Sequence, residues 1–158
     1  MASYGKLALF ALVIFVAVVH SAAQEAQITQ VNDGVMVKTA SDQVHVAVCG
    51  PEVIHVTAGP ESAKPSSPHQ PWMMNECTGD KFTIEKNDKA ATLKTAQLQV
   101  KIGLEGGGLT FLDAGGKALL TEGIWAPFST RRYHAVGNGI FSVSDQFQIP
   151  EDDAIYGL

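Results

Sequence analysis

Apolar and polar residues alternate strictly in several short stretches of this chain, and this period of two most restricts its fold. The alternation runs through residues 44–48, 82–85, 98–104 and 141–149. Successive side chains of a β-strand point to opposite faces, so each stretch predicts a strand with one face on a core and the other toward water. In the last stretch, the residues expected to share one face are Phe141, Val143, Phe147 and Ile149.

Turn-forming residues separate these stretches at short, regular intervals. Residues that tolerate tight or left-handed backbone occur at Asn32-Asp33-Gly34, Gly50-Pro51, Asn87-Asp88, Gly106-Gly107-Gly108, Gly115-Gly116 and Gly137-Asn138-Gly139. Beyond the N-terminal segment, no window shows the apolar period of a helix. Short strands with frequent turns predict an all-β chain folded as an antiparallel β-sandwich.

The N-terminal segment 1–23 has the pattern of an export signal. Lys6 precedes an apolar run over residues 7–19, and Ser21-Ala22-Ala23 offers small residues for cleavage. The run is too short for a membrane span, which needs roughly 20 residues. An uncleaved anchor is the alternative. We therefore expect a secreted or periplasmic protein whose mature part, 24–158, has no membrane partner.

Charge argues against a nucleic-acid partner. The chain has 16 acidic against 11 basic side chains, for a formal net charge of −5. Its only adjacent basic pair is Arg131-Arg132, whereas binding to phosphates needs clustered lysine and arginine.

A proline-rich stretch at 59–80 interrupts the strand pattern. Four of the seven prolines of the chain fall here, at Pro60, Pro65, Pro68 and Pro71. Proline cannot donate to a sheet ladder, so we expect a long surface loop. Such loops are often functional, but a variable insertion without a role is equally compatible with the sequence.

Two cysteines, Cys49 and Cys77, flank most of this loop. A disulfide between them would be permitted in an oxidising compartment and would contribute about 3 kcal/mol. Two unpaired thiols are the alternative. His45 and His55 would complete a set of metal ligands, but no recognised zinc spacing links these residues, and the sequence predicts no metal site.

Aromatic and basic side chains gather around Pro127. The members of this group are Trp125, Phe128, Arg131, Arg132 and Tyr133. Aromatic rings stack on sugars and guanidinium groups bind hydroxyls, so Trp125, Arg131 and Tyr133 are candidate carbohydrate-binding residues. Trp72, in the proline-rich loop, is a further candidate. The alternative is that the aromatic side chains close one end of the sandwich by packing.

Several segments also resemble one known family in their order along the chain. They are Asp33-Gly34-Val35, residues 44–48, 53–56, 91–95 and 98–100, the Phe111-x-Asp113-x-x-Gly116-Lys117 hairpin, and Phe147 followed by Ala154-Ile155-Tyr156-Gly157-Leu158. Together they resemble the N-terminal domain of glycoside hydrolase family 31, the retaining α-glucosidases and α-xylosidases. His55 and Asp153 depart from the pattern, since the family commonly has arginine and glutamate there.

The resemblance implies a sandwich similar to galactose-mutarotase-like domains, packed in the parent enzyme on a (β/α)8 barrel that carries the catalytic aspartates. A barrel needs about 250 residues, so this chain would be an N-terminal fragment, incomplete at its C-terminal end and without catalytic residues. The parent would hydrolyse α-linked carbohydrate with retention and without a cofactor. The alternatives are a stand-alone secreted carbohydrate-binding sandwich and an interaction module with no sugar ligand.

Overall fold

The computed structural model describes residues 25–63, 77, 79–123 and 131–148. The predicted signal peptide, 1–23, lies outside the described residues. All regular structure in the described part is β-strand, and no described helix is long and apolar enough to cross a membrane.

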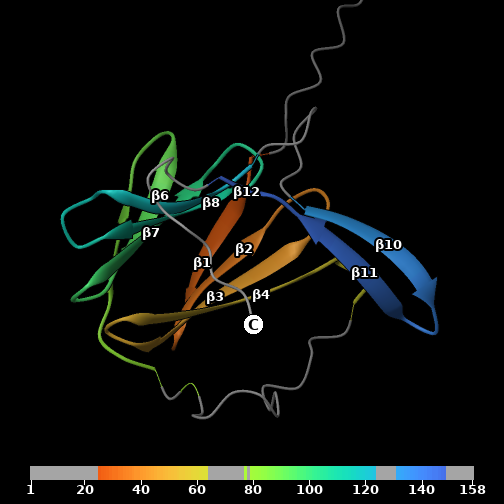
Figure 1. Ribbon diagram of the computed structural model, residues 1–158, viewed down its shortest axis with the longest axis horizontal. Helices are drawn as coiled ribbons and strands as arrows, with labels where there is room; N and C mark the ends of the chain where they lie inside the picture. The colour runs from red at the N-terminus through yellow and green to blue at the C-terminus, as the bar shows by residue number, and fades with distance from the viewer. Residues whose placement is uncertain (1–24, 64–76, 78, 124–130, 149–158) are drawn as a thin grey trace, which may run out of the picture.

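The first sheet is a four-stranded antiparallel meander formed by the N-terminal part of the chain (Figure 1). Its strands, in spatial as in sequence order, are β1 (Gln27–Val31), β2 (Gly34–Lys38), β3 (Gln43–Gly50) and β4 (Val53–Gly59). The predicted Asn32-Asp33-Gly34 turn joins the first two strands.

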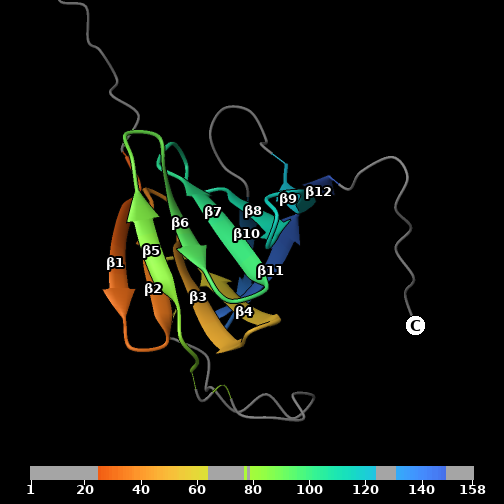
Figure 2. The same ribbon diagram turned by 90° about the vertical axis from the view of Figure 1, so that its left-hand side faces the viewer.

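The second sheet has six strands in the order β12-β9-β8-β7-β6-β5. Its strands are β5 (Thr83–Lys86), β6 (Ala90–Lys94), β7 (Leu98–Gly103), β8 (Leu109–Asp113), β9 (Ala118–Glu122) and the short β12 (Phe147–Gln148). The first five form a second meander, and β12 adds to its edge beside β9. Figure 2 shows this sheet and the first as two layers.

A separate antiparallel hairpin is formed by β10 (Arg131–Gly137) and β11 (Ile140–Asp145). Asn138, at its tip, has a left-handed φ of 53°, a conformation that asparagine tolerates better than most residues. In Figure 1 the hairpin extends sideways from the two layers.

The core lies between the two sheets and is made of branched aliphatic side chains. Its buried members are Ala26, Val35, Val37, Val44, Val46, Val48, Leu93, Val100, Ile102 and Leu109. The alternating valines of β2 and β3 supply one wall of this core, as period-two alternation requires.

Close approach of two strands explains one of the turn glycines. A Cβ atom on Gly34 would lie 2.0 Å from the carbonyl oxygen of Val46. No side chain fits at that distance, so the first residue of β2 has to be glycine for β3 to pair beside it.

The prediction of an all-β antiparallel sandwich is confirmed, but the core face expected along 141–149 is wrong for Val143 and Phe147, and Ile149 lies outside the described residues. The stretch divides into β11 and β12, which belong to different sheets. Val143 and Phe147 are exposed, by 51% and 44%. Alternation shows which residues share a face, but it cannot show whether another layer covers that face.

Candidate functional site

Of the four residues predicted to bind carbohydrate, Arg131 and Tyr133 fall on β10, while Trp72 and Trp125 lie outside the described residues. Arg131 and Tyr133 are two residues apart on one strand, so their side chains share a face. That face of the hairpin is turned toward the sandwich, and both side chains reach the same carboxylate there, that of Asp42.

Arg131 is at the centre of a buried polar cluster. Its Nη2 donates to Oε1 and Oε2 of Glu122, at 2.6 and 2.5 Å, and its Nη1 donates to Oδ2 of Asp42 at 3.2 Å. The side chains of all three residues are at most 3% exposed. Nε of Arg131 is also 4.0 Å from Oδ2 of Asp145 on β11.

Asp42 is held in place by the turn between β2 and β3. Thr39 Oγ1 donates to Asp42 Oδ1 at 2.5 Å, and the backbone N–H of Asp42 donates back to the same hydroxyl oxygen at 3.1 Å. The other carboxylate oxygen is left for the hairpin, where it accepts from Arg131 and from the Tyr133 hydroxyl at 3.0 Å. A local turn thus presents one oxygen to a strand about 90 residues further along the chain.

Glu122 fixes the other side of the cluster. Its Oε2 also accepts from the backbone N–H of Leu109 at 2.8 Å, which ties the end of β9 to the start of β8. The cluster therefore joins the first sheet, the second sheet and the hairpin.

Burial and an excess of carboxyl groups shift the pKa values of the cluster. Burial raises the pKa of Glu122, although the charge of Arg131 opposes this. Burial acts to lower the pKa of Arg131, but Glu122 and then Asp42 outweigh it, and the pKa lies above its ordinary value. Burial and then the charge of Asp42 raise the pKa of Tyr133. The guanidinium therefore stays charged, and the phenol keeps its proton to high pH.

In this arrangement the cluster supports the fold. Direct contact of Arg131 or Tyr133 with a sugar stays a prediction, since both polar groups are bound to carboxylates in the structure. No pattern in the sequence marked Asp42 or Glu122 as members of a site. The Thr39-to-Asp42 turn was readable locally, but the pairing of Asp42 with Arg131 depends on how three separate elements assemble.

The cysteines form a second group, on the first sheet. Cys49 and Cys77 are joined in a disulfide with their Cα atoms 4.4 Å apart. The bond ties the far end of the 59–80 stretch to β3. Among the described residues of that stretch, none beyond Gly59 is in a strand.

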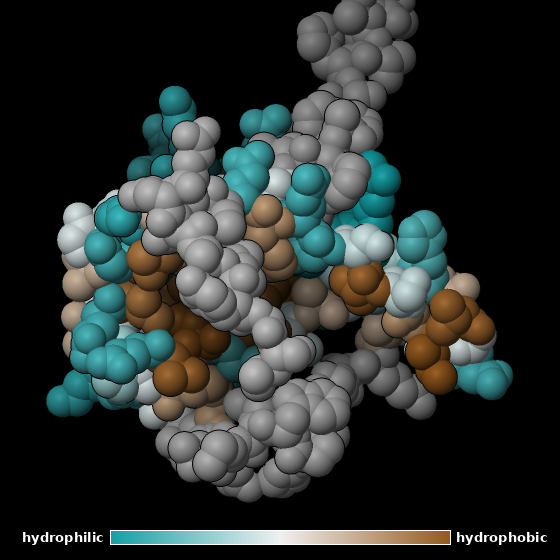
Figure 3. Space-filling view, in the orientation of Figure 1, coloured by the Kyte–Doolittle hydropathy of each residue, from teal (hydrophilic) through white to brown (hydrophobic). Residues whose placement is uncertain are grey.

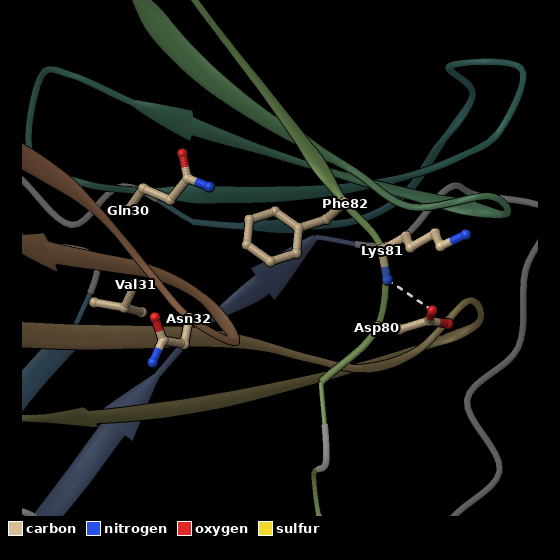
Figure 4. A pocket seen from close by; sticks show the side chains of 6 residues that line it. All are labelled: Gln30, Val31, Asn32, Asp80, Lys81 and Phe82. Carbon is tan, nitrogen blue, oxygen red and sulfur yellow. Dashed lines mark hydrogen bonds between the residues drawn. The ribbon is translucent and has the colours of Figure 1, made fainter.

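A shallow hollow of about 450 Å³ lies between the end of β1 and the chain entering β5. It is lined by Gln30, Val31, Asn32, Asp80, Lys81 and Phe82. Figure 4 shows the Phe82 ring between Gln30 and Lys81, and the Lys81 backbone N–H donates to Asp80 Oδ1 at 2.6 Å. The hollow is open and polar, and it holds none of the residues predicted to bind a ligand.

Comparison with known proteins adds a relationship at the level of the fold. No protein-family profile matches the chain. A solved structure, the family 31 (GH31) α-xylosidase from Xanthomonas citri, is similar with a TM-score of 0.56 and 24% sequence identity. The match covers 82% of this chain but only 13% of that enzyme. The chain therefore has the β-sandwich fold of one segment of a GH31 α-xylosidase.

Proposed function

We propose that this chain is the N-terminal sandwich of a secreted retaining α-glycosidase of glycoside hydrolase family 31. The observation that carries the proposal is the shared fold over 82% of the chain with a segment of the α-xylosidase. The segments between Asp33 and Leu158 that resemble the family in their order along the chain favour the same family independently of the structure. The parent enzyme would cleave α-glucosidic or α-xylosidic bonds.

The chain itself would supply no catalytic carboxylate. Retaining hydrolysis needs two carboxyl groups about 5–5.5 Å apart, one as nucleophile and one as acid and base, both facing the substrate. Within the described residues, Asp42 and Glu122 come together, but both are buried and both bind Arg131. A (β/α)8 barrel in the parent enzyme would bring the catalytic pair, and no cofactor is required.

The hairpin offers a surface for packing against that barrel. Of the six large apolar side chains that are exposed in the described part, three lie on the hairpin, namely Val136, Ile140 and Val143. Figure 3 shows apolar surface on this hairpin, away from the main body. Exposed apolar groups gathered on a projecting element are typical of an interface between domains.

The native product provides the test. An antibody raised against 24–158 should detect a secreted protein several times larger than 16.8 kDa. The immunopurified protein should hydrolyse an aryl α-xyloside or α-glucoside and release the α-anomer first by NMR, because two inversions restore the configuration.

A native product no larger than 16.8 kDa and without hydrolase activity would contradict the proposal. Saturable binding of maltose or xylo-oligosaccharides by that product would then support a stand-alone carbohydrate-binding sandwich. Its absence would favour an interaction module.

A further inference from the structure

Three side chains with metal-binding atoms meet on the first sheet, outside the Arg131 cluster. Sγ of Cys49, Sγ of Cys77 and one ring nitrogen of His55 all lie within 4.8 Å of one another. All three residues are half-buried. The sequence offered these three residues, together with His45, as possible ligands but predicted no metal site, because their spacing matches no zinc motif.

A β-bulge explains why these residues meet. Val48 pairs with Ile54 and Gly50 pairs with Val53, so Cys49 is an extra residue of β3 without a partner on β4. Bulges commonly re-aim a side chain. His55 pairs with Ala47, on the face opposite the buried Val46 and Val48, and the disulfide holds Cys77 beside Cys49.

We propose that reduction of the Cys49–Cys77 disulfide converts this group into a Zn²⁺ site with His55 as the third protein ligand. Two thiolates and one imidazole are ligands that zinc prefers, and a water would complete four-coordination. Zn–S and Zn–N bonds of about 2.3 and 2.0–2.1 Å place neighbouring ligands roughly 3.5–4 Å apart. The two sulfurs, once their bond is broken, have to move apart to this distance, whereas the ring nitrogen of His55 already lies within 4.8 Å of both of them.

The conversion balances with a dithiol as the reductant. The dithiol transfers two electrons and two protons to the disulfide, breaking the S–S bond and forming two thiols, and is itself oxidised to a disulfide. Binding of Zn²⁺ then releases the two thiol protons, and His55 coordinates as the neutral imidazole. The disulfide and the zinc site are mutually exclusive states of the same residues.

Anaerobic titration with Co²⁺, a spectroscopic substitute for Zn²⁺, tests the site. The chain is reduced with a dithiol, the reductant is removed, and Co²⁺ is added while absorbance is recorded. We expect thiolate-to-cobalt charge-transfer bands and the visible bands of tetrahedral Co²⁺, both lost on adding Zn²⁺. The oxidised chain should show neither.

His55→Ala is the decisive variant, since it leaves the disulfide intact for folding before reduction. We expect Co²⁺ affinity to fall at least tenfold, because even the loss of a residue that supports a ligand costs about 10–100-fold. His134→Ala, an exposed histidine on β10, is the matched control and should bind as the unmodified chain does. Circular dichroism follows the β-structure of each reduced protein throughout.

Two results would overturn the proposal. One is the absence of charge-transfer bands in the reduced chain, whether or not circular dichroism shows that it has stayed folded. The other is equal Co²⁺ affinity for the unmodified chain and His55→Ala, which would show a dithiolate that binds metal without the histidine.

Discussion

The sandwich and the β10–β11 hairpin are held in the molecule by different kinds of interaction. The two sheets pack through aliphatic side chains such as Val46, Leu93 and Ile102, which are fully buried. The hairpin buries almost none of its apolar side chains and is attached at its base through Arg131 and Tyr133. Apolar packing is non-directional, whereas a hydrogen-bonded ion cluster fixes one orientation. The orientation of the hairpin is therefore set by the ion pairs and hydrogen bonds of the Arg131 cluster, and not by apolar packing.

The largest expected effect comes from removing the cation of the cluster. Arg131→Met should lower the free energy of unfolding by about 3–5 kcal/mol, because Asp42 and Glu122 remain buried without a counter-charge. Urea unfolding followed by circular dichroism measures the change. Arg132→Met, at the exposed next position on the strand, should cost less than about 1 kcal/mol.

A second substitution distinguishes loss of charge pairing from loss of packing. Adding Glu122→Gln to Arg131→Met should recover part of the stability, since it removes one unpaired carboxylate. If the loss in the free energy of unfolding of the double variant equals the sum of the losses in the two single variants, the charges of the cluster act independently of one another.

The core should respond to loss of volume, and the hairpin should not. Leu93→Ala removes a fully buried side chain facing the opposite sheet and should cost about 2–5 kcal/mol, which calorimetry will record as a lower Tm. Val143→Ala, on exposed β11, is the comparison and should cost well under 1 kcal/mol. Similar losses for the two variants would show that the hairpin packs on the core in solution.

Tyr133 tests the second attachment of the hairpin. Tyr133→Phe removes the hydroxyl that donates to Asp42 Oδ2 and should cost about 1–2 kcal/mol at neutral pH, because the acceptor is a buried carboxylate. Urea unfolding at pH 7 gives the value. No measurable change would mean that Arg131 alone satisfies Asp42.

The same residue makes the protein sensitive to alkali. The pKa of Tyr133 in the folded protein is raised above its ordinary 10.0, so the folded state keeps a proton that the unfolded chain loses. This contribution to stability is complete below pH 10 and decreases as the pH rises further. Tm should therefore fall less between pH 9 and pH 11 in Tyr133→Phe than in the unmodified chain. An equal fall in both proteins would contradict the raised pKa.

The smallest effect on stability is expected at the hairpin tip. Ile140→Ser, at a position 62% exposed, should change the free energy of unfolding by no more than about 0.5 kcal/mol. If the hairpin packs against a catalytic barrel, the same substitution should nevertheless reduce the yield of active full-length enzyme. An unchanged yield would argue against the hairpin as the interface.

Local sequence patterns were enough to predict most strands of the sandwich. Alternating valines predicted β3, and the Asn87-Asp88 turn, where Asn87 Oδ1 accepts from the Lys89 and Ala90 backbone N–H groups, fixed the β5–β6 hairpin. Only part of the candidate site could be predicted from the sequence. Arg131 and Tyr133 stood out as a basic and an aromatic residue, but no local pattern marked Asp42 or Glu122.

By itself, the sequence determined the all-β class, the places where most strands turn, and which residues share a face, because these depend on neighbours along the chain. The tertiary structure alone decided that Val143 faces solvent, that Arg131 is buried among carboxylates, and that His55 lies beside Cys49 and Cys77. Each of these depends on contacts between distant segments. Burial and charge pairing depend on which surfaces pack together when the sheets assemble, and the local alternation of residues does not specify this.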